Sequence, residues 1–268
     1  MSAVTQKSSF GAAQIILFFS IAVLVILVAF PVLLILFNAF WVNGEFNIRD
    51  VTRIILEPET YKALTNSLII ASGTTIGSTI VGTFFAWLVT RTDLPYKSFM
   101  KAMFLVPFML PSFIGALAWK MLLSPNAGFI NKFFINNFGF DGPIFNIYSY
   151  LGIVLVEVMY LFPFVFIQVC GALERMDPTL EESARISGAG LFTITRKITI
   201  PLVLPSILSG ALLIMLYSMA HFGTVAVLGI ENGIFNIPTL IYQRIHQSAG
   251  SFDSIRTGTV LATVLVVT

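Results

Sequence analysis

Charged side chains are scarce in this 268-residue chain. They make up 10% of the residues, whereas hydrophobic residues make up 57%. Soluble domains average about 25% charged and about 45–50% apolar residues. The mean hydropathy of +0.91 agrees with this contrast, and we predict a membrane protein. A net charge of +2 is too small to indicate a nucleic-acid partner.

Cysteine and catalytic motifs are also scarce. Cys170 is the only cysteine, which excludes an intrachain disulfide and a thiol metal cluster. The sequence has no phosphate-binding G-x-x-x-x-G-K-[ST] loop, no His/Cys/Asp/Glu cluster with metal-ligand spacing and no nucleophile–base pair. We therefore expect a chain that is not an enzyme, binds no cofactor or metal and cannot hydrolyse ATP.

Long apolar runs dominate what is present. A spanning helix needs about 20 apolar residues, and the first run is too long for a signal-peptide core of about 7–15 residues. A further apolar run starts at Thr257 and continues to Thr268. We predict an all-α membrane protein, a polytopic transmembrane helix bundle with five full spans and a truncated sixth, and the N-terminal half of a longer protein. The five predicted spans are 15–40, 64–90, 99–123, 151–173 and 204–229.

Two of these spans carry helix-modifying residues. Gly73, Gly77 and Gly82 lie four or five residues apart, which is typical of a close helix-packing face. Pro107 and Pro111 bracket three apolar residues and predict a locally broken third span, since proline lacks the amide hydrogen that a helix interior needs.

Lysine and arginine predict the orientation. Eight of the fifteen are Lys7, three within 91–101, and four within the loop that follows the fourth span. Cytoplasmic loops carry an excess of these residues. We therefore expect the N-terminus and the 174–203 loop to face the cytoplasm.

The most informative pattern lies within that loop. It consists of Glu182-Ser183-Ala184, then three residues, Gly188, nine residues, and Ile198-Thr199-Ile200-Pro201. This spacing resembles the EAA loop of binding-protein-dependent ABC importer permeases, which reads E-A-A, three residues, G, nine residues, I-x-L-P. Ser183 replaces the middle alanine and Ile200 replaces the leucine.

Local chemistry predicts two short helices in this loop. Asp177-Pro178 is a helix start, because Asp can cap and Pro is favoured at the first position. Glu181 and Glu182 complement the dipole of the first turns, and Glu182 can pair with Arg185. Gly188 can take the left-handed cap.

The second short helix is expected to run from Leu191 to Ile200. Pro201 should end it and Pro205 should open the next span. From the residues alone, the alternative is a solvated amphipathic loop with ordinary caps.

The resemblance implies that residues 1–268 form the transmembrane domain of a type I ABC permease in a bacterial cytoplasmic (inner) membrane. It implies that 174–203 is a coupling loop on a cytoplasmic ATPase. Two ATPase subunits, which bind the ATP and magnesium, would be partners. An extracytoplasmic binding protein and a second permease half, fused or separate, would complete the complex. The implied coupling residues are Glu181, Glu182, Ser183, Ala184, Arg185, Gly188, Ile198 and Pro201.

Two ionisable residues lie within predicted spans. Ionisable groups in a membrane are costly and mark candidate pathway residues. Glu157 either lines a translocation cavity or is hydrogen-bonded between helices. His221 is either a pathway residue or a packing histidine; related permeases often carry an acid at this position before Phe-Gly.

The substrate is less constrained than the family. The chain resembles ferric-iron permeases at Asn66–Leu68, Leu122–Gly128 and Phe222–Gly229. Polyamine, thiamine and oxyanion permeases share the EAA loop and remain alternatives, although no Lys or Arg lies well inside a span, which disfavours sulfate and phosphate. An ATP-independent carrier would show inverted repeats with paired intramembrane charges. An intramembrane enzyme would show a catalytic constellation of residues. Neither pattern is found in the sequence.

Overall fold

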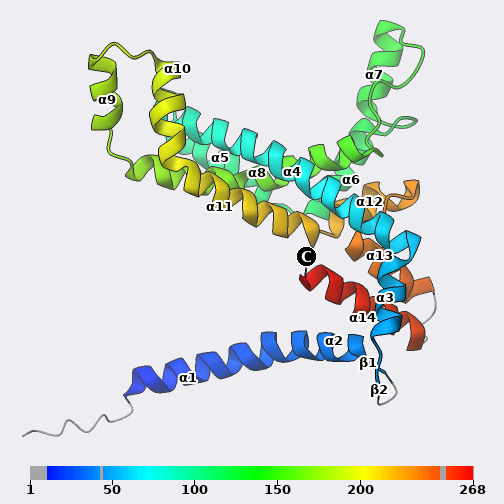
Figure 1. The fold of residues 1–268 in the computed structure, drawn as a ribbon. Coiled ribbons are helices and arrows are strands. Elements are labelled where there is room, and N and C mark those ends of the chain that lie inside the picture. Colours follow the sequence, from blue (N-terminus) through cyan, green and yellow to red (C-terminus); the bar gives the residue numbers. More distant parts are fainter. Residues whose placement is uncertain (1–10, 43–44, 248–251, 268) are drawn as a thin grey trace, which may run out of the picture. The chain divides into compact units, whose positions relative to one another are not determined.

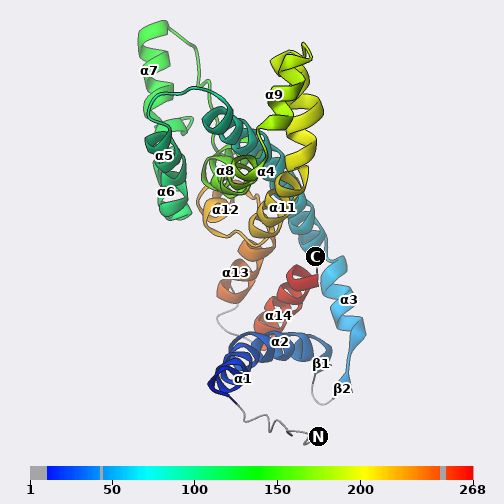
Figure 2. The ribbon, with the colours of Figure 1, turned by 90° about the vertical axis from the view of Figure 1, so that its left-hand side faces the viewer.

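The protein is an assembly of helices. The computed structural model describes residues 11–42, 45–247 and 252–267, and forms two compact units: Pro58–Leu240, and the described residues before and after it (Figures 1 and 2). The elements of the smaller unit are α1 (Ala12–Leu24), the π-helix η1 (Val25–Ala29), α2 (Phe30–Phe40), β1 (Trp41–Val42), β2 (Glu45–Phe46), α3 (Ile48–Leu56) and α14 (Phe252–Val267).

Helices of the larger unit are more numerous, and α13 (Ile237–Gln247) continues from it into the smaller one. The others are α4 (Pro58–Arg91), α5 (Lys97–Met109), α6 (Ser112–Leu123), α7 (Phe129–Phe138), α8 (Tyr150–Arg175), α9 (Thr179–Ile186), α10 (Leu191–Ile194), the π-helix η2 (Thr195–Thr199), α11 (Ile200–Met219), α12 (Gly223–Leu228) and the 3-10 helix η3 (Ile230–Asn232).

The smaller unit contains the first predicted span. Residues Gln14–Phe40 form one apolar helix that is long enough to cross a membrane. A π-turn, in which the Phe30 N–H reaches the Val25 carbonyl, comes just before Pro31. The widened turn accommodates the missing amide hydrogen of the proline. Two strands pair antiparallel, with Trp41 opposite Phe46, and α14 packs on α2 and α3.

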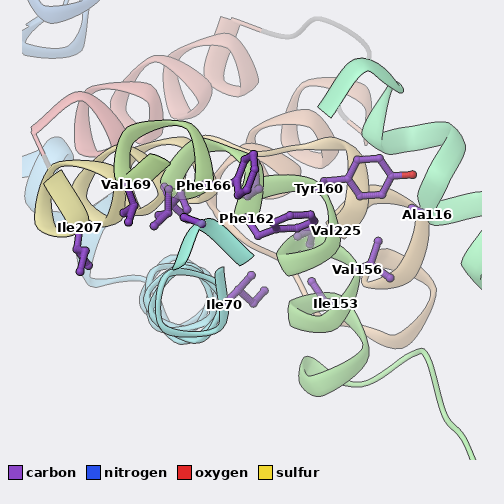
Figure 3. Packing of buried hydrophobic residues seen from close by; sticks show 14 of the residues in the cluster. Ile70, Ala116, Ile153, Val156, Tyr160, Phe162, Phe166, Val169, Ile207 and Val225 are labelled. Atoms are coloured by element: carbon purple, nitrogen blue, oxygen red, sulfur yellow. The ribbon is translucent and has the colours of Figure 1, made fainter. Parts of the chain in front are cut away.

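Helices α4, α8 and α11 form the centre of the larger unit. Their shared apolar core includes Ile70, Val169 and Ile207 (Figure 3). The glycine face of α4 packs on α8 as predicted. At Gly82 the approach is so close that a β-carbon would lie 2.7 Å from the Phe162 carbonyl oxygen.

The third predicted span is broken, also as predicted. Helices α5 and α6 meet at an angle of 94°. Leu110 is extended, with φ −88° and ψ 138°, because the residue before a proline is excluded from the helical region. Pro111 is extended as well, and α6 starts at the next residue.

The fifth predicted span was placed wrongly. The spanning helix runs from Leu191 to Met219 instead of 204–229, and α12 is a separate short helix. Pro201 does not end a helix, because it lies in the first turn after the π-turn of η2, where its missing amide hydrogen leaves no helical bond unmade.

The all-α polytopic fold is confirmed. Within the described residues, four helices are long and apolar enough to span a membrane, or five when the bent α5–α6 pair is counted as one span. These five segments correspond to the five predicted spans. Near the C-terminal end, Arg256–Val266 forms a shorter apolar helix.

We expect Gly82→Ala to destabilise the larger unit, since the added methyl group meets backbone atoms of α8 that cannot move aside. Overpacking of this kind costs about 1–3 kcal/mol. Thermal unfolding of the full-length protein in detergent measures it. Gly171→Ala on α8 is the control, because its added carbon meets only the end of Arg175 at 3.6 Å. Equal melting temperatures for the two variants would contradict the packing described above.

Candidate functional site

Helix α9 begins as the sequence predicts. The Asp177 carboxylate accepts a hydrogen bond from the Thr179 amide at 2.9 Å, and the Pro178 carbonyl accepts one from Glu182 at 3.1 Å. The amide and hydroxyl of Thr179 lower the pKa of Asp177 below its ordinary value, because they stabilise the charged carboxylate.

The predicted left-handed cap at Gly188 is confirmed. Its φ is +85°, the Ala189 amide donates to the Ala184 carbonyl at 3.0 Å, and the Gly188 amide donates to Arg185 at 2.9 Å. This is the Schellman arrangement of a helix C-terminus. No other part of the described chain lies within 4 Å of where a β-carbon would be, so the backbone conformation alone selects glycine.

Glu181 anchors α9 to the bundle. Its side chain is buried and lies 3.0–3.1 Å from Nε of Arg91, the last residue of α4. The Thr199 hydroxyl donates to the same carboxylate at 2.6 Å, and Arg91 also donates to the Leu173 carbonyl at 3.0 Å. The ends of α4 and α8, helix α9 and the π-turn η2 are therefore joined at one point.

The other coupling residues are more accessible. Glu182, Ser183, Arg185, Gly188 and Pro201 are exposed, whereas Ala184 and Ile198 are half-buried. The ion pairs of the described residues do not include Glu182 with Arg185, so the pairing that their spacing allows is not formed. In Figure 1, α9 and α10 lie at the opposite end of the α4–α8–α11 bundle from α12.

Glu157, on α8, is fully buried. Its Oε2 accepts hydrogen bonds from Thr74 of α4 at 3.0 Å and from Ser218 of α11 at 2.5 Å, and its Oε1 lies 3.2 Å from Nδ1 of His221. The carboxylate is therefore surrounded by donors from three segments, which is how a buried acid is tolerated.

His221 lies in the break between α11 and α12, where it is 7% exposed. Its Nε2 is 2.7 Å from the Ser112 hydroxyl at the start of α6, and its carbonyl accepts from Asn236 at 2.7 Å. The two ionisable residues found in separate apolar runs thus meet as a pair. Nothing in the sequence pointed to Thr74, Ser112 or Ser218, because serine and threonine are common in spanning helices.

Residues 78–268 match the family of the binding-protein-dependent transport system inner membrane component. The chain belongs to this family. The predicted resemblance is therefore confirmed at the level of the family, for a match that includes α9, Glu157 and His221.

Three relatives show how broad the family is. FbpB 1 of Haemophilus influenzae, a candidate ferric transport system permease, is 28% identical over 80% of this chain and 33% of its own length. PotB of Escherichia coli, a spermidine/putrescine permease, is 30% identical over 69% of this chain and 66% of its own length. ModB of E. coli, a molybdenum permease, is 32% identical over 76% of this chain and 87% of its own length. The chain thus spans a third of FbpB 1 and just under two thirds of PotB.

Solved structures share the fold. A bacterial ABC transporter involved in import of the polysaccharide alginate superposes with a TM-score of 0.72 at 17% identity, covering 95% of this chain and 91% of its own. The MetNI methionine ABC transporter gives a TM-score of 0.56 at 18% identity, covering 79% of this chain and 92% of its own. The predicted ABC importer permease fold is confirmed.

We expect Glu181→Ala in this permease-family chain to loosen α9, because half-buried Arg91 would lose its charged partner and Thr199 its acceptor. Breaking a buried pair costs about 3–5 kcal/mol. Hydrogen exchange of residues 177–190 should rise strongly. Glu174→Ala removes an exposed partner of Lys101 and is the matched control. Unchanged exchange in Glu181→Ala would show that the anchor does not hold the loop.

A double-mutant cycle tests the buried pair. We expect Glu157→Gln and His221→Asn to destabilise the protein non-additively, with a coupling of about 0.5–3 kcal/mol. The reason is that either change alone disrupts the contact between the two buried side chains. Thermal unfolding of the two single variants and the double variant gives the coupling. Additive losses would mean that the two side chains do not interact in solution.

Proposed function

We propose that this chain is a transmembrane permease subunit of an ATP-driven ABC importer. The observation that carries the proposal is α9, a short helix closed by a left-handed glycine and anchored by Glu181, with an exposed coupling motif, in a chain of the permease family. Hydrolysis of ATP would take place in a separate partner, because the sequence carries no phosphate-binding loop.

The proposed partners are two cytoplasmic ABC ATPase subunits, an extracytoplasmic binding protein and a second permease half, fused or separate. The family description, which names a binding-protein-dependent system, supports the binding protein. A related alginate transporter has been solved in complex with its substrate-bound periplasmic protein. The Lys and Arg distribution supports an inner-membrane orientation with the N-terminus and α9 in the cytoplasm.

The geometry supplies a route for coupling. Movement of α9 by a closing ATPase pair would act through Glu181 on Arg91 of α4 and on Thr199 of η2. Because Leu191–Met219 is a single helix, a displacement at its cytoplasmic end reaches Ser218 and the adjoining His221 at the other. The coupling loop and the Glu157–His221 pair are thus connected by one continuous helix. Such a connection suits a bundle that alternates between outward and inward openings.

Ferric iron is the substrate that the sequence resemblance favours, and the similarity to FbpB 1 supports it. Similar identities to PotB and ModB keep a polyamine or an oxyanion as alternatives. No cluster of three or more His, Cys, Asp or Glu able to hold a metal ion occurs among the described residues. A ferric permease needs none, since the binding protein can hold the metal until release.

We expect Gly188→Asp to uncouple ATP hydrolysis from uptake, lowering uptake by about tenfold or more while the ATPase keeps its basal rate. A residue with a β-carbon disfavours φ +85°, and Asp also places a negative charge at the C-terminal end of α9, where the helix dipole is negative. Uptake and ATP hydrolysis by the reconstituted complex measure it.

Gly190→Asp is the matched control. Gly190 is also unhindered at its β-position, but it is extended, with φ −71° and ψ 159°, which any residue can adopt. Uptake should stay near the wild-type rate in this variant. Wild-type coupling in Gly188→Asp would refute α9 as the docking element.

A further inference from the structure

An open cavity of about 430 Å³ lies at the bend between α5 and α6. Its polar lining comes from Ser112, Tyr160, Tyr217 and His221. The lining contains no Asp, Glu, Lys or Arg. Glu157 is not part of the lining, because its carboxylate lies fully buried behind His221. The polar side chains of the lining are therefore hydroxyl-bearing residues and one imidazole.

One side of this cavity is a helix N-terminus. Helix α6 has twelve residues and starts at Ser112 with no side-chain cap. The Pro111 carbonyl accepts from the amides of Ile114 and Gly115, so the helical hydrogen bonds begin only there. The N–H groups of Ser112 and Phe113 precede them and have no carbonyl within the helix. The positive end of the helix dipole at such a terminus favours an anion.

Tyr160 supplies a second, independent observation. Its side chain is only 9% exposed, yet no described residue makes a hydrogen bond to its hydroxyl. A β-carbon on Gly115 would lie 1.5 Å from that hydroxyl, which places the oxygen against the first turn of α6. Figure 3 shows the side chain reaching from α8 toward α6, near Ala116. The hydroxyl itself is not among the fully buried unpaired atoms of the described residues, so it reaches the cavity that Tyr160 lines and can donate to a ligand there.

The neighbouring imidazole contributes to the same side of the cavity. Glu157 is three residues before Tyr160 on α8, so both lie on one face of the helix. Glu157 engages Nδ1 of His221 and thereby fixes the ring with Nε2 toward Ser112. Tyr160 and the start of α6 therefore line one cavity, in which the Ser112 hydroxyl is engaged by His221.

We propose that this cavity is a transient binding site for an oxyanion group of the transported substrate. The inference rests on the proposed transport function and names its substrate chemistry. It also removes the objection that no Lys or Arg lies inside a span, because the amides of α6 supply partial positive charge. A free tetrahedral oxyanion and an oxyanion ligand coordinated to iron(III) present the same oxygen atoms to these donors.

Equilibrium binding to the full-length permease in complex with its ATPases, in lipid nanodiscs, tests the site. Radiolabelled molybdate is one probe and iron(III) citrate is the other, with spermidine as a competitor. We expect Tyr160→Phe to weaken binding of the recognised probe by about tenfold or more, the loss typical of a hydrogen bond to a charged group. Tyr150→Phe is the control on the same helix, since its hydroxyl donates to Asn66 instead.

The outcomes separate the two proposals. Binding of molybdate supports a free oxyanion, and binding of iron(III) citrate alone supports an oxyanion ligand on the metal. Absence of binding of either probe, equal affinity in Tyr160→Phe, or displacement by spermidine overturns the oxyanion site even when the ATPases co-purify and hydrolyse ATP. Failure of any ATPase to co-purify would instead refute the permease function.

Discussion

The burial of Glu157 is the constraint on which the larger unit depends. A carboxylate with no exposed surface needs donors from several directions, and here α4, α11 and the segment after α11 each provide one. His221 can donate only because α11 ends at Met219 and the chain turns before α12. The packing of three helices, the end of α11 and the position of α6 therefore follow from satisfying one acid.

The same chemistry recurs at the opposite end of the bundle. Glu181 is buried and is bonded to Arg91 and Thr199, so movement of α9 is coupled to the ends of α4 and η2. Glu182, its neighbour, is exposed and free of such constraints. Adjacent acids thus have separate tasks, one holding the loop to the bundle and the other facing outward. The single helix Leu191–Met219 contacts both polar clusters, which makes it the mechanical link between them.

Local rules predicted much of this structure. Apolar run lengths gave the positions of four of the five spans, proline spacing predicted the broken third one, and glycine chemistry predicted the cap at Gly188. The prediction failed at Pro201, because a π-turn upstream removes the penalty on which the rule depends. The contact between Glu157 and His221 could not be predicted, since 64 residues separate them and no spacing rule relates side chains on different helices.

An anion site of the kind proposed at the α5–α6 bend would need no full charge. A lysine or arginine inside a span is costly in the empty state and would hold an anion tightly once bound. Backbone amides at a helix start carry partial charge at no such cost, and they can be supplemented by hydroxyls such as that of Tyr160. A transport site must release what it binds in every cycle. The donors of the proposed site are weak, and the bend at Pro111 fixes their position. Glu157 orients His221, which contacts Ser112, but Glu157 does not itself line the cavity. Such a site would meet that requirement.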